Sequence, residues 1–514
     1  MAKQFGRSAV LRAALLVTGS TYVAFATGLV ASMLTARALG PADYGRYAYL
    51  VWLSGILVIL MNNGLTTSSI RFVSEYIGRS DQRAASALHH WFWVRQWWCV
   101  ALVGGVFLAV SPLVQPVGWQ AGVVVMAVIV ILASVPKAWY LFGVSVAKGY
   151  GRFGIEATSL TTMSLASMLG VIVLMLLDAH LYAYLALFIV SSLAHPALLH
   201  RLPQSPRRDP QHRDPGNEIE QRIKPHLYWT ALLLACTVFY GSSMSMLFLN
   251  HHASAETIAF FSVAIALTRG GVELLSSGLN SVLMPLMAHG FGEGGRQRTS
   301  EISAVAMRMF HFCGLLLTGV GLFWAAPLVL ALYGPKYAEA VFAFQVLVVT
   351  GGLTLPWNVL GTLLSTTDKQ RTRFVFAAVS LVISGVTAWL FIPDHGLHGA
   401  LLSYAITSFA AYGGLIFATV RDGSLTVPLG PIVRLTAAAI LAAAVAGSLL
   451  LLSTSLWMQI AAGGVFVLLY PLLSLVLRAW RATELGLIAQ QAHRLGRFGA
   501  LVQGIERWGA GPTA

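Results

Sequence analysis

The chain has 514 residues, enough for about three soluble domains of ordinary size. Its composition excludes that arrangement, because 57% of the residues are hydrophobic and only 10% are charged, whereas a soluble domain carries roughly 25% charged residues. The net charge of +14 would suggest a nucleic-acid partner in a soluble protein. Here the basic residues lie in the polar gaps between apolar runs, as membrane topology requires. We therefore expect a polytopic membrane protein that binds no nucleic acid.

Long apolar runs predict helical spans rather than barrel strands, because a spanning helix needs about 20 apolar residues and a barrel strand only about 10, in alternation. The first run is too long for a cleaved signal peptide, so we expect a retained helix. An all-α fold of about 14 transmembrane helices follows. In chain order the expected spans are 13–36, 45–66, 87–110, 122–147, 157–177, 182–200, 226–249, 257–287, 303–326, 338–364, 374–392, 398–420, 431–452 and 457–477.

One polar gap is longer than the others and divides the chain. Residues 201–225 are rich in proline and charge, a composition that predicts a flexible linker. The expected organisation is a six-helix bundle over 1–200, this linker, a second six-helix bundle over 226–420, and helices 13 and 14 within 421–480. Apolar residues at helical spacing in 481–514 predict an amphipathic tail on the cytoplasmic leaflet.

The gaps alternate in charge, which sets the expected orientation. With the N-terminus in the cytoplasm, about 27 basic residues fall in cytoplasmic gaps and about three in outside gaps. The three outside residues are Arg37, Arg46 and Lys336. We expect both termini to be cytoplasmic.

Catalytic and metal-binding patterns are absent from the sequence. It contains no GxxxxGK[ST], HExxH, CxxC or GxSxG. The three cysteines, Cys99, Cys236 and Cys313, lie in apolar runs and have no zinc or disulfide spacing. The outside loops are too short for the catalytic domain of a polysaccharide polymerase or ligase. We expect a transporter rather than an enzyme, with no cofactor and no metal site.

The informative residues are ionisable groups within apolar runs: Arg95, Lys137, Arg269, Glu273 and Arg308. A charge near the bilayer centre costs about 2.5–3.5 kcal/mol on insertion scales, so such groups usually face a cavity or a partner. Their net positive charge predicts a cationic cavity for an anionic substrate such as a pyrophosphate. Two alternatives stay open. Arg269 and Glu273 are spaced i,i+4 and can neutralise each other, and Arg95 and Arg308 can extend to the inner surface.

Several motifs resemble the polysaccharide transporter family, which contains the Wzx-type oligosaccharide flippases. Residues 35–48, TARALGPADYGRYA, look like the signature loop of that family, and 63–76 fit the same pattern. AKGYGRF at 147–153 resembles its turn after the fourth helix, and YGPKY at 333–337 is typical of a later loop. The resemblance covers roughly residues 8–480. Arg37 and Arg46 match the signature loop and are expected at an outer gate.

The resemblance implies the fold of the multidrug/oligosaccharidyl-lipid/polysaccharide exporter superfamily, with two helix bundles around a central cavity. It implies transfer of undecaprenyl-pyrophosphate-linked oligosaccharide across the bacterial inner membrane, coupled to a proton or sodium gradient. The polymerase and export machinery of the same pathway would be partners, together with membrane lipid. We expect Arg95, Lys137 and Arg269 to bind substrate and Glu273 to couple it to the ion. A multidrug-type exporter, a peptidoglycan-precursor flippase and a membrane polymerase or ligase are the alternatives.

Overall fold

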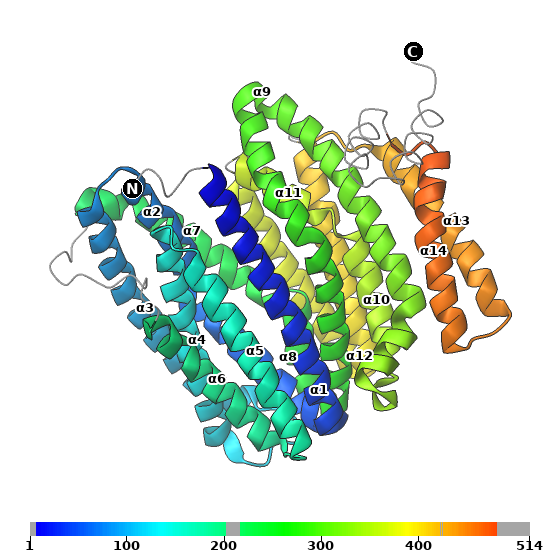
Figure 1. Cartoon of the computed structure of the whole chain (residues 1–514), viewed down its shortest axis with the longest axis horizontal. Coiled ribbons are helices and arrows are strands. Elements are labelled where there is room, and N and C mark those ends of the chain that lie inside the picture. Colours follow the sequence, from blue (N-terminus) through cyan, green and yellow to red (C-terminus); the bar gives the residue numbers. More distant parts are fainter. Residues whose placement is uncertain (1–6, 202–215, 368, 422, 424, 481–514) are drawn as a thin grey trace. The chain divides into compact units, whose positions relative to one another are not determined.

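The computed structural model describes residues 7–201, 216–367, 369–421, 423 and 425–480 (Figure 1). Every regular element within these residues is a helix. The expected tail, 481–514, lies outside the described residues, as does most of the expected linker. The all-α expectation is confirmed for the part of the chain described.

The helices follow one another with short connections (Figure 1). In chain order they are α1 Arg7–Asn62, α2 Leu65–Gly78, α3 Gln82–Val110, η2 Ser111–Val114, α4 Gly122–Gly149, α5 Gly154–Leu176, α6 Leu181–Arg201, α7 Asn217–Phe239, α8 Ser242–His252, α9 Ala255–Tyr333, η3 Pro335–Tyr337, α10 Ala340–Leu353, α11 Trp357–Thr366, α12 Gln370–Arg421, α13 Leu429–Ser448, η4 Leu449–Leu451 and α14 Leu456–Val476.

Ten helices in the described residues are long and apolar enough to cross a membrane, or up to twelve if each of two bent helix pairs makes one span. Three of the ten contain an internal break: Leu16–Asn62, Arg371–Arg421 and His289–Tyr333. In the first two, the break leaves a long helical run on each side, whereas in His289–Tyr333 it lies close to the start. Each is longer than the roughly 20 residues that cross a bilayer. If each bent pair makes one span, and Leu16–Asn62 and Arg371–Arg421 each make two crossings, the described helices account for the expected 14.

Each break contains a glycine with a positive φ angle. Gly40 has φ of 71° within α1, and Gly396 has φ of 49° within α12. In α9 the break lies at Gly294 and Gly295, where Figure 1 shows the helix folding back on itself. A residue with a Cβ is disfavoured at positive φ, so glycine permits each reversal. At each of these positions the chain passes from one helix to the next through the glycine, without a long loop.

The chain divides into two compact units. Unit 1 comprises Met1–Ala266 and Gln370–Thr407, and unit 2 comprises Leu267–Lys369 and Ser408–Ala514. The expected boundary at the linker, between 1–200 and 226–420, stays a prediction.

The core of unit 1 includes a cluster of buried side chains from α2, α3, α4 and α7. Phe72, Phe92 and Phe142 belong to it, and so does Ile223 of α7, which is fully buried. Helix α7 begins at Asn217, so residues 217–225, expected in the flexible linker, are helical. Ile219, Ile223 and Leu227 recur every four residues and meet this core on one helix face. Their burial stabilises helix where charge and proline suggested a linker.

The core of unit 2 includes a cluster from α9, α13 and α14. Phe466 stacks on Tyr470 at a centroid distance of 5.6 Å, and Tyr470 stacks on Phe312 at 5.0 Å. Alanines of α13, among them Ala438 and Ala442, are fully buried in the same cluster. Small residues on one face let α13 approach its neighbours closely, as is usual in membrane helix packing.

Candidate functional site

Arg95 of α3 is held by groups from two helices of unit 1. Its Nη2 donates to Oε1 of Glu220 in α7 at 2.7 Å, and its Nη1 donates to the carbonyl oxygen of Trp91 at 3.4 Å. The guanidinium carbon lies 3.2 Å from the centre of the Trp91 ring, a cation–π contact. The Arg95 side chain remains 32% exposed. Arg95 therefore has a fixed orientation and is still accessible.

A second ion pair joins α7 to α2 on the same side of unit 1. Arg222 donates from Nη1 to Oε1 of Glu75 at 2.7 Å and from Nη2 to Oε2 at 3.1 Å. The hydrogen bonds from Arg222, and then the positive charges of Arg222, Arg79 and Arg71, hold the pKa of the Glu75 carboxyl below its usual range. We refer to Glu75, Arg95, Glu220 and Arg222 as the α7 clasp.

Each carboxylate of the α7 clasp has another basic partner on its own helix. Lys224 Nζ lies 3.2 Å from Oε1 of Glu220, one turn along α7. Arg79 Nη2 lies 2.5 Å from Oε1 of Glu75, one turn along α2. The arrangement is thus two interhelical pairs, each backed by an intrahelical pair.

Lys137 lies in α4 immediately after Pro136 and is half-buried. It interacts electrostatically with His195 of α6. Nδ1 of His195 lies 2.6 Å from the carbonyl oxygen of Ser191, and its ring packs edge-on against Tyr140 at 4.7 Å. Among the described residues, the Lys137 ammonium has no hydrogen bond and no carboxylate within 4.0 Å. It is a cation in an apolar helix that interacts electrostatically with a histidine of α6.

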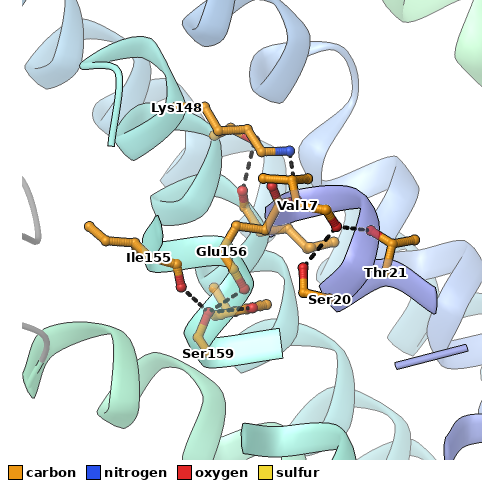
Figure 2. A network of polar contacts seen from close by, with 10 residues as sticks. Val17, Ser20, Thr21, Lys148, Ile155, Glu156 and Ser159 are labelled. Atoms are coloured by element: carbon orange, nitrogen blue, oxygen red, sulfur yellow. Dashed lines mark hydrogen bonds and ion pairs between the residues drawn. The ribbon is translucent and has the colours of Figure 1, made fainter. Parts of the chain in front are cut away.

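The AKGYGRF turn places a third ion pair beside α1. Lys148, in the last turn of α4, lies 2.6 Å from Glu156 in the first turn of α5. Gly151 between them has φ of 76°, which explains why the motif carries glycine there. Figure 2 shows this pair in one polar network with Val17, Ser20 and Thr21 of α1. The motif thus has a structural role, closing the α4–α5 turn.

The signature motif lies at the opposite end of unit 1, where α1 reverses. Arg46 pairs with Asp43 at 2.6 Å and donates from Nε to the carbonyl oxygen of Val117 at 3.3 Å. Asn250 of α8 accepts from the Val117 amide at 3.1 Å and donates to the Gln115 carbonyl oxygen at 2.8 Å. Residues 115–119 are therefore held between α1 and α8.

A glycine of the same motif permits a close helix contact. A Cβ on Gly45 would collide with the backbone carbonyl of Ala255, at the start of α9. Arg37, the other motif arginine, has an exposed side chain. The motif residues thus make contacts at one end of unit 1, and their role as an outer gate stays a prediction.

The remaining predicted site residues belong to unit 2. Arg269 lies in α9 with an exposed side chain. Glu273 lies in the same helix, but its side chain is outside the described residues, so its pairing with Arg269 stays a prediction. Arg95 and Lys137 belong to unit 1 and have different neighbours, Glu220 and His195 respectively. The Arg308 side chain is 1% exposed, which contradicts the alternative that it extends to the inner surface.

Unit 2 also contains a cavity of about 810 Å³. Leu353, Ile416, Leu429 and Ile432 contribute to an apolar wall, and His311 and Tyr412 add polar atoms. Nε2 of His311 lies 3.0 Å from the Thr436 hydroxyl, which fixes the ring.

Sequence reasoning missed Glu220 and Arg222 because both fell in the expected linker. The four-residue spacing of Ile219, Ile223 and Leu227 is the signal that could have placed them on a helix. Asn250 was missed because a single asparagine near a helix end has no distinctive pattern. His195 was missed for the same reason, because a single histidine within an apolar run has no distinctive pattern.

Comparison with solved structures finds membrane transporters with a similar fold. The chain is similar to a structure titled "Lipid II flippase MurJ, inward closed conformation", with 13% identity, a TM-score of 0.68, and coverage of 89% of this chain and 98% of that chain. It is similar to an inward-facing multidrug resistance MATE transporter of the MOP superfamily, with 14% identity, a TM-score of 0.63, and 77% and 94% coverage. It is also similar to an outward-facing MATE transporter of the same description, with 16% identity, a TM-score of 0.56, and coverage of 81% of this chain and 95% of that chain. These likenesses show that this chain shares the overall fold of these transporter structures.

A sequence profile described as "Polysaccharide biosynthesis protein" matches residues 34–342. The match spans more than half of the chain, which belongs to this family. No curated protein matches the sequence.

Proposed function

We propose that this protein is a flippase that moves undecaprenyl-pyrophosphate-linked oligosaccharide across the inner membrane for O-antigen, exopolysaccharide or capsule synthesis. The observation that carries the proposal is membership of the polysaccharide biosynthesis family in a chain with a flippase-like fold. A polysaccharide pathway needs its lipid-linked repeat unit on the outer leaflet. The carrier is a pyrophosphate, an anion that cationic side chains recognise.

Arg95, Lys137 and Arg269 are the proposed contacts for the diphosphate. Lys137 is the best supported, because its half-buried ammonium has no carboxylate partner among the described residues. The arginine fork of Arg95 matches phosphate oxygens in geometry. We propose Glu273 as the group that couples transport to a proton or sodium ion, and Arg37 and Arg46 as outer-gate residues. Both termini are cytoplasmic in this proposal, and the motion is alternating access.

The deciding experiment is deletion of the gene, followed by extraction of lipid-linked sugars and measurement of surface polysaccharide. Accumulation of undecaprenyl-linked repeat units on the inner leaflet, with loss of surface polymer, supports the proposal. Failure to form repeat units, or their accumulation on the outer leaflet, contradicts it.

A peptidoglycan-precursor flippase is the second candidate, favoured by the likeness to the lipid II flippase structure. Deletion would then cause accumulation of lipid-linked peptidoglycan precursor and cell lysis. A multidrug exporter would instead alter drug tolerance and leave both lipid-linked pools unchanged. Analysis of the same lipid extracts, together with a measurement of drug tolerance, therefore distinguishes the three candidate functions.

A further inference from the structure

The first turns of α7 attach to the rest of unit 1 through a small apolar contact, a set of ion pairs and a hydrogen bond between Arg71 of α2 and His226 at 3.2 Å. Ile223 is fully buried against α2, α3 and α4, and Ile219 and Leu227 are partly buried beside it. The other attachments include the two interhelical ion pairs of the α7 clasp. We refer to residues 217–227 as the α7 segment. An attachment with so few buried side chains is suited to reversible opening.

The four charged side chains of the α7 clasp differ in what detachment leaves behind. Glu220 would retain Lys224, and Glu75 would retain Arg79, because both partners lie on the same helix as the carboxylate. Arg222 is 47% exposed already, so water can solvate it. Arg95 lies in an apolar, spanning helix and would lose its carboxylate. Detachment therefore leaves Arg95 as the less exposed of the two arginines that lose a carboxylate partner.

The geometry around Arg95 suits an anion that replaces Glu220. The guanidinium is already oriented by the Trp91 ring and carbonyl. Glu220 takes only one of its fork nitrogens, Nη2. A diphosphate can accept from two nitrogens at once and carries more charge than a carboxylate, so it can compete for this position.

We propose that Arg95 is a switch for which Glu220 and the pyrophosphate group of the lipid-linked substrate compete. Binding of the pyrophosphate displaces Glu220 onto Lys224 and so releases the α7 segment from α2 and α3. The identity of the anion rests on the proposed function. Under this inference Glu220 is a positioning residue: it holds the α7 segment closed in the absence of substrate and prevents opening of an unloaded transporter.

The test measures exposure of the α7 segment through a cysteine placed at its buried position. Cys99, Cys236 and Cys313 are replaced by serine and Ile223→Cys is added, all in the full chain. The rate of reaction with a water-soluble maleimide is measured in liposomes of phosphatidylethanolamine and phosphatidylglycerol. Undecaprenyl pyrophosphate is the probe, and uncharged undecaprenol is its matched control. Ile219→Cys supplies an independent position on the same face if Ile223→Cys fails to fold.

We expect slow labelling without ligand and a rate at least about threefold higher with undecaprenyl pyrophosphate. Undecaprenol leaves the rate unchanged. Glu220→Gln and Arg95→Gln each raise the rate without ligand, and Arg95→Gln abolishes the response to ligand. The control is Glu301→Gln, which breaks an ion pair with Arg298 in unit 2 and leaves the rate unchanged.

Two further cysteines define the limits of the assay. Gln221→Cys is exposed and labels rapidly in every condition, whereas Val146→Cys, 1% exposed in the same core, labels slowly in every condition. A rise at Val146→Cys together with Ile223→Cys would indicate general loosening and overturn the proposal. Two other results would also overturn it. One is a labelling rate that neither Glu220→Gln nor Arg95→Gln changes. The other is faster labelling in these variants when undecaprenyl pyrophosphate does not change the rate of the Ile223→Cys protein that lacks them. The gene-deletion experiment tests the proposed function independently of this switch, because its result is the identity of the lipid that accumulates in cells.

Discussion

The Arg222 guanidinium of α7 holds both carboxylate oxygens of Glu75 of α2, at 2.7 and 3.1 Å. Two parallel hydrogen bonds between a guanidinium and a carboxylate form the strongest geometry available to an ion pair. The contact joins residues 147 positions apart in the sequence. It joins α7 to α2, two helices that also meet in the buried cluster containing Phe72 and Ile223.

The first prediction concerns the pH dependence of stability through Glu75. Arg222 lowers the pKa of this carboxyl from its ordinary value of 4.5. A group with a lowered folded-state pKa stabilises the fold above its unfolded pKa, and this stabilisation is lost as pH falls through the folded-state value. Glu75→Gln should cost roughly 0.5–1 kcal/mol at pH 7, reduced by solvent screening. Thermal unfolding in detergent at pH 7 and below pH 4 should show a difference only at pH 7.

Glu301→Gln is the control for that measurement, because its pair with Arg298 is 54% exposed on both sides. It should leave the melting temperature unchanged at both pH values. If the Glu75→Gln protein were equally destabilised at low pH, the stabilisation could not come from the ionised Glu75 carboxylate paired with Arg222.

The second prediction concerns Gly45 in the signature motif. Gly45→Ala forces a Cβ against the Ala255 backbone, which cannot rotate away as a side chain can. Overpacking of this kind typically costs about 1–3 kcal/mol. Gly55→Ala, in the same helix with open space around its Cβ, is the matched control. Melting temperatures should fall for the first variant and hold or rise for the second. Equal melting temperatures would mean that α1 and α9 do not approach closely here.

The third prediction separates binding from stability at Lys137. Lys137→Met should reduce surface polysaccharide in a complementation assay by at least about tenfold, the loss expected for one charge-assisted hydrogen bond. Its melting temperature should hold or rise, because no carboxylate loses a partner. Lys148→Met, which leaves Glu156 without its ion-pair partner, should show lower stability. Full complementation by Lys137→Met would remove Lys137 from the substrate site.

The fourth prediction concerns the loop held by Asn250. Asn250→Ala removes both hydrogen bonds to residues 115–119 and should cost about 1–3 kcal/mol, because the side chain is 3% exposed. Hydrogen exchange should show faster exchange at the Val117 amide. Asn358→Ala in α11, far along the chain in unit 2, is the control and should leave that amide unchanged. Unchanged protection of Val117 in Asn250→Ala would show that Asn250 does not hold the loop.

The sequence by itself determined the fold class and the membrane helices. Both depend on the length and hydropathy of local runs, because a bilayer requires each spanning segment to satisfy its own backbone hydrogen bonds. The broken helices α1 and α12 also followed local rules, since Gly40 and Gly396 lie at the expected interruptions between apolar runs. The signature motif indicated the family from local sequence alone, and the profile match over residues 34–342 confirmed it.

Only the tertiary structure decided which charges meet. Arg95 was expected at a binding site, but nothing local indicated that Glu220 would reach it from 125 residues away. The burial of Arg308 was equally hidden, since exposure depends on the helices packed around it. Ile223 made residues 217–225 helical through contact with α2, α3 and α4, overriding their charge and proline content. Long-range packing and ion pairing are properties of neighbours in space, and a single sequence records those neighbours only indirectly.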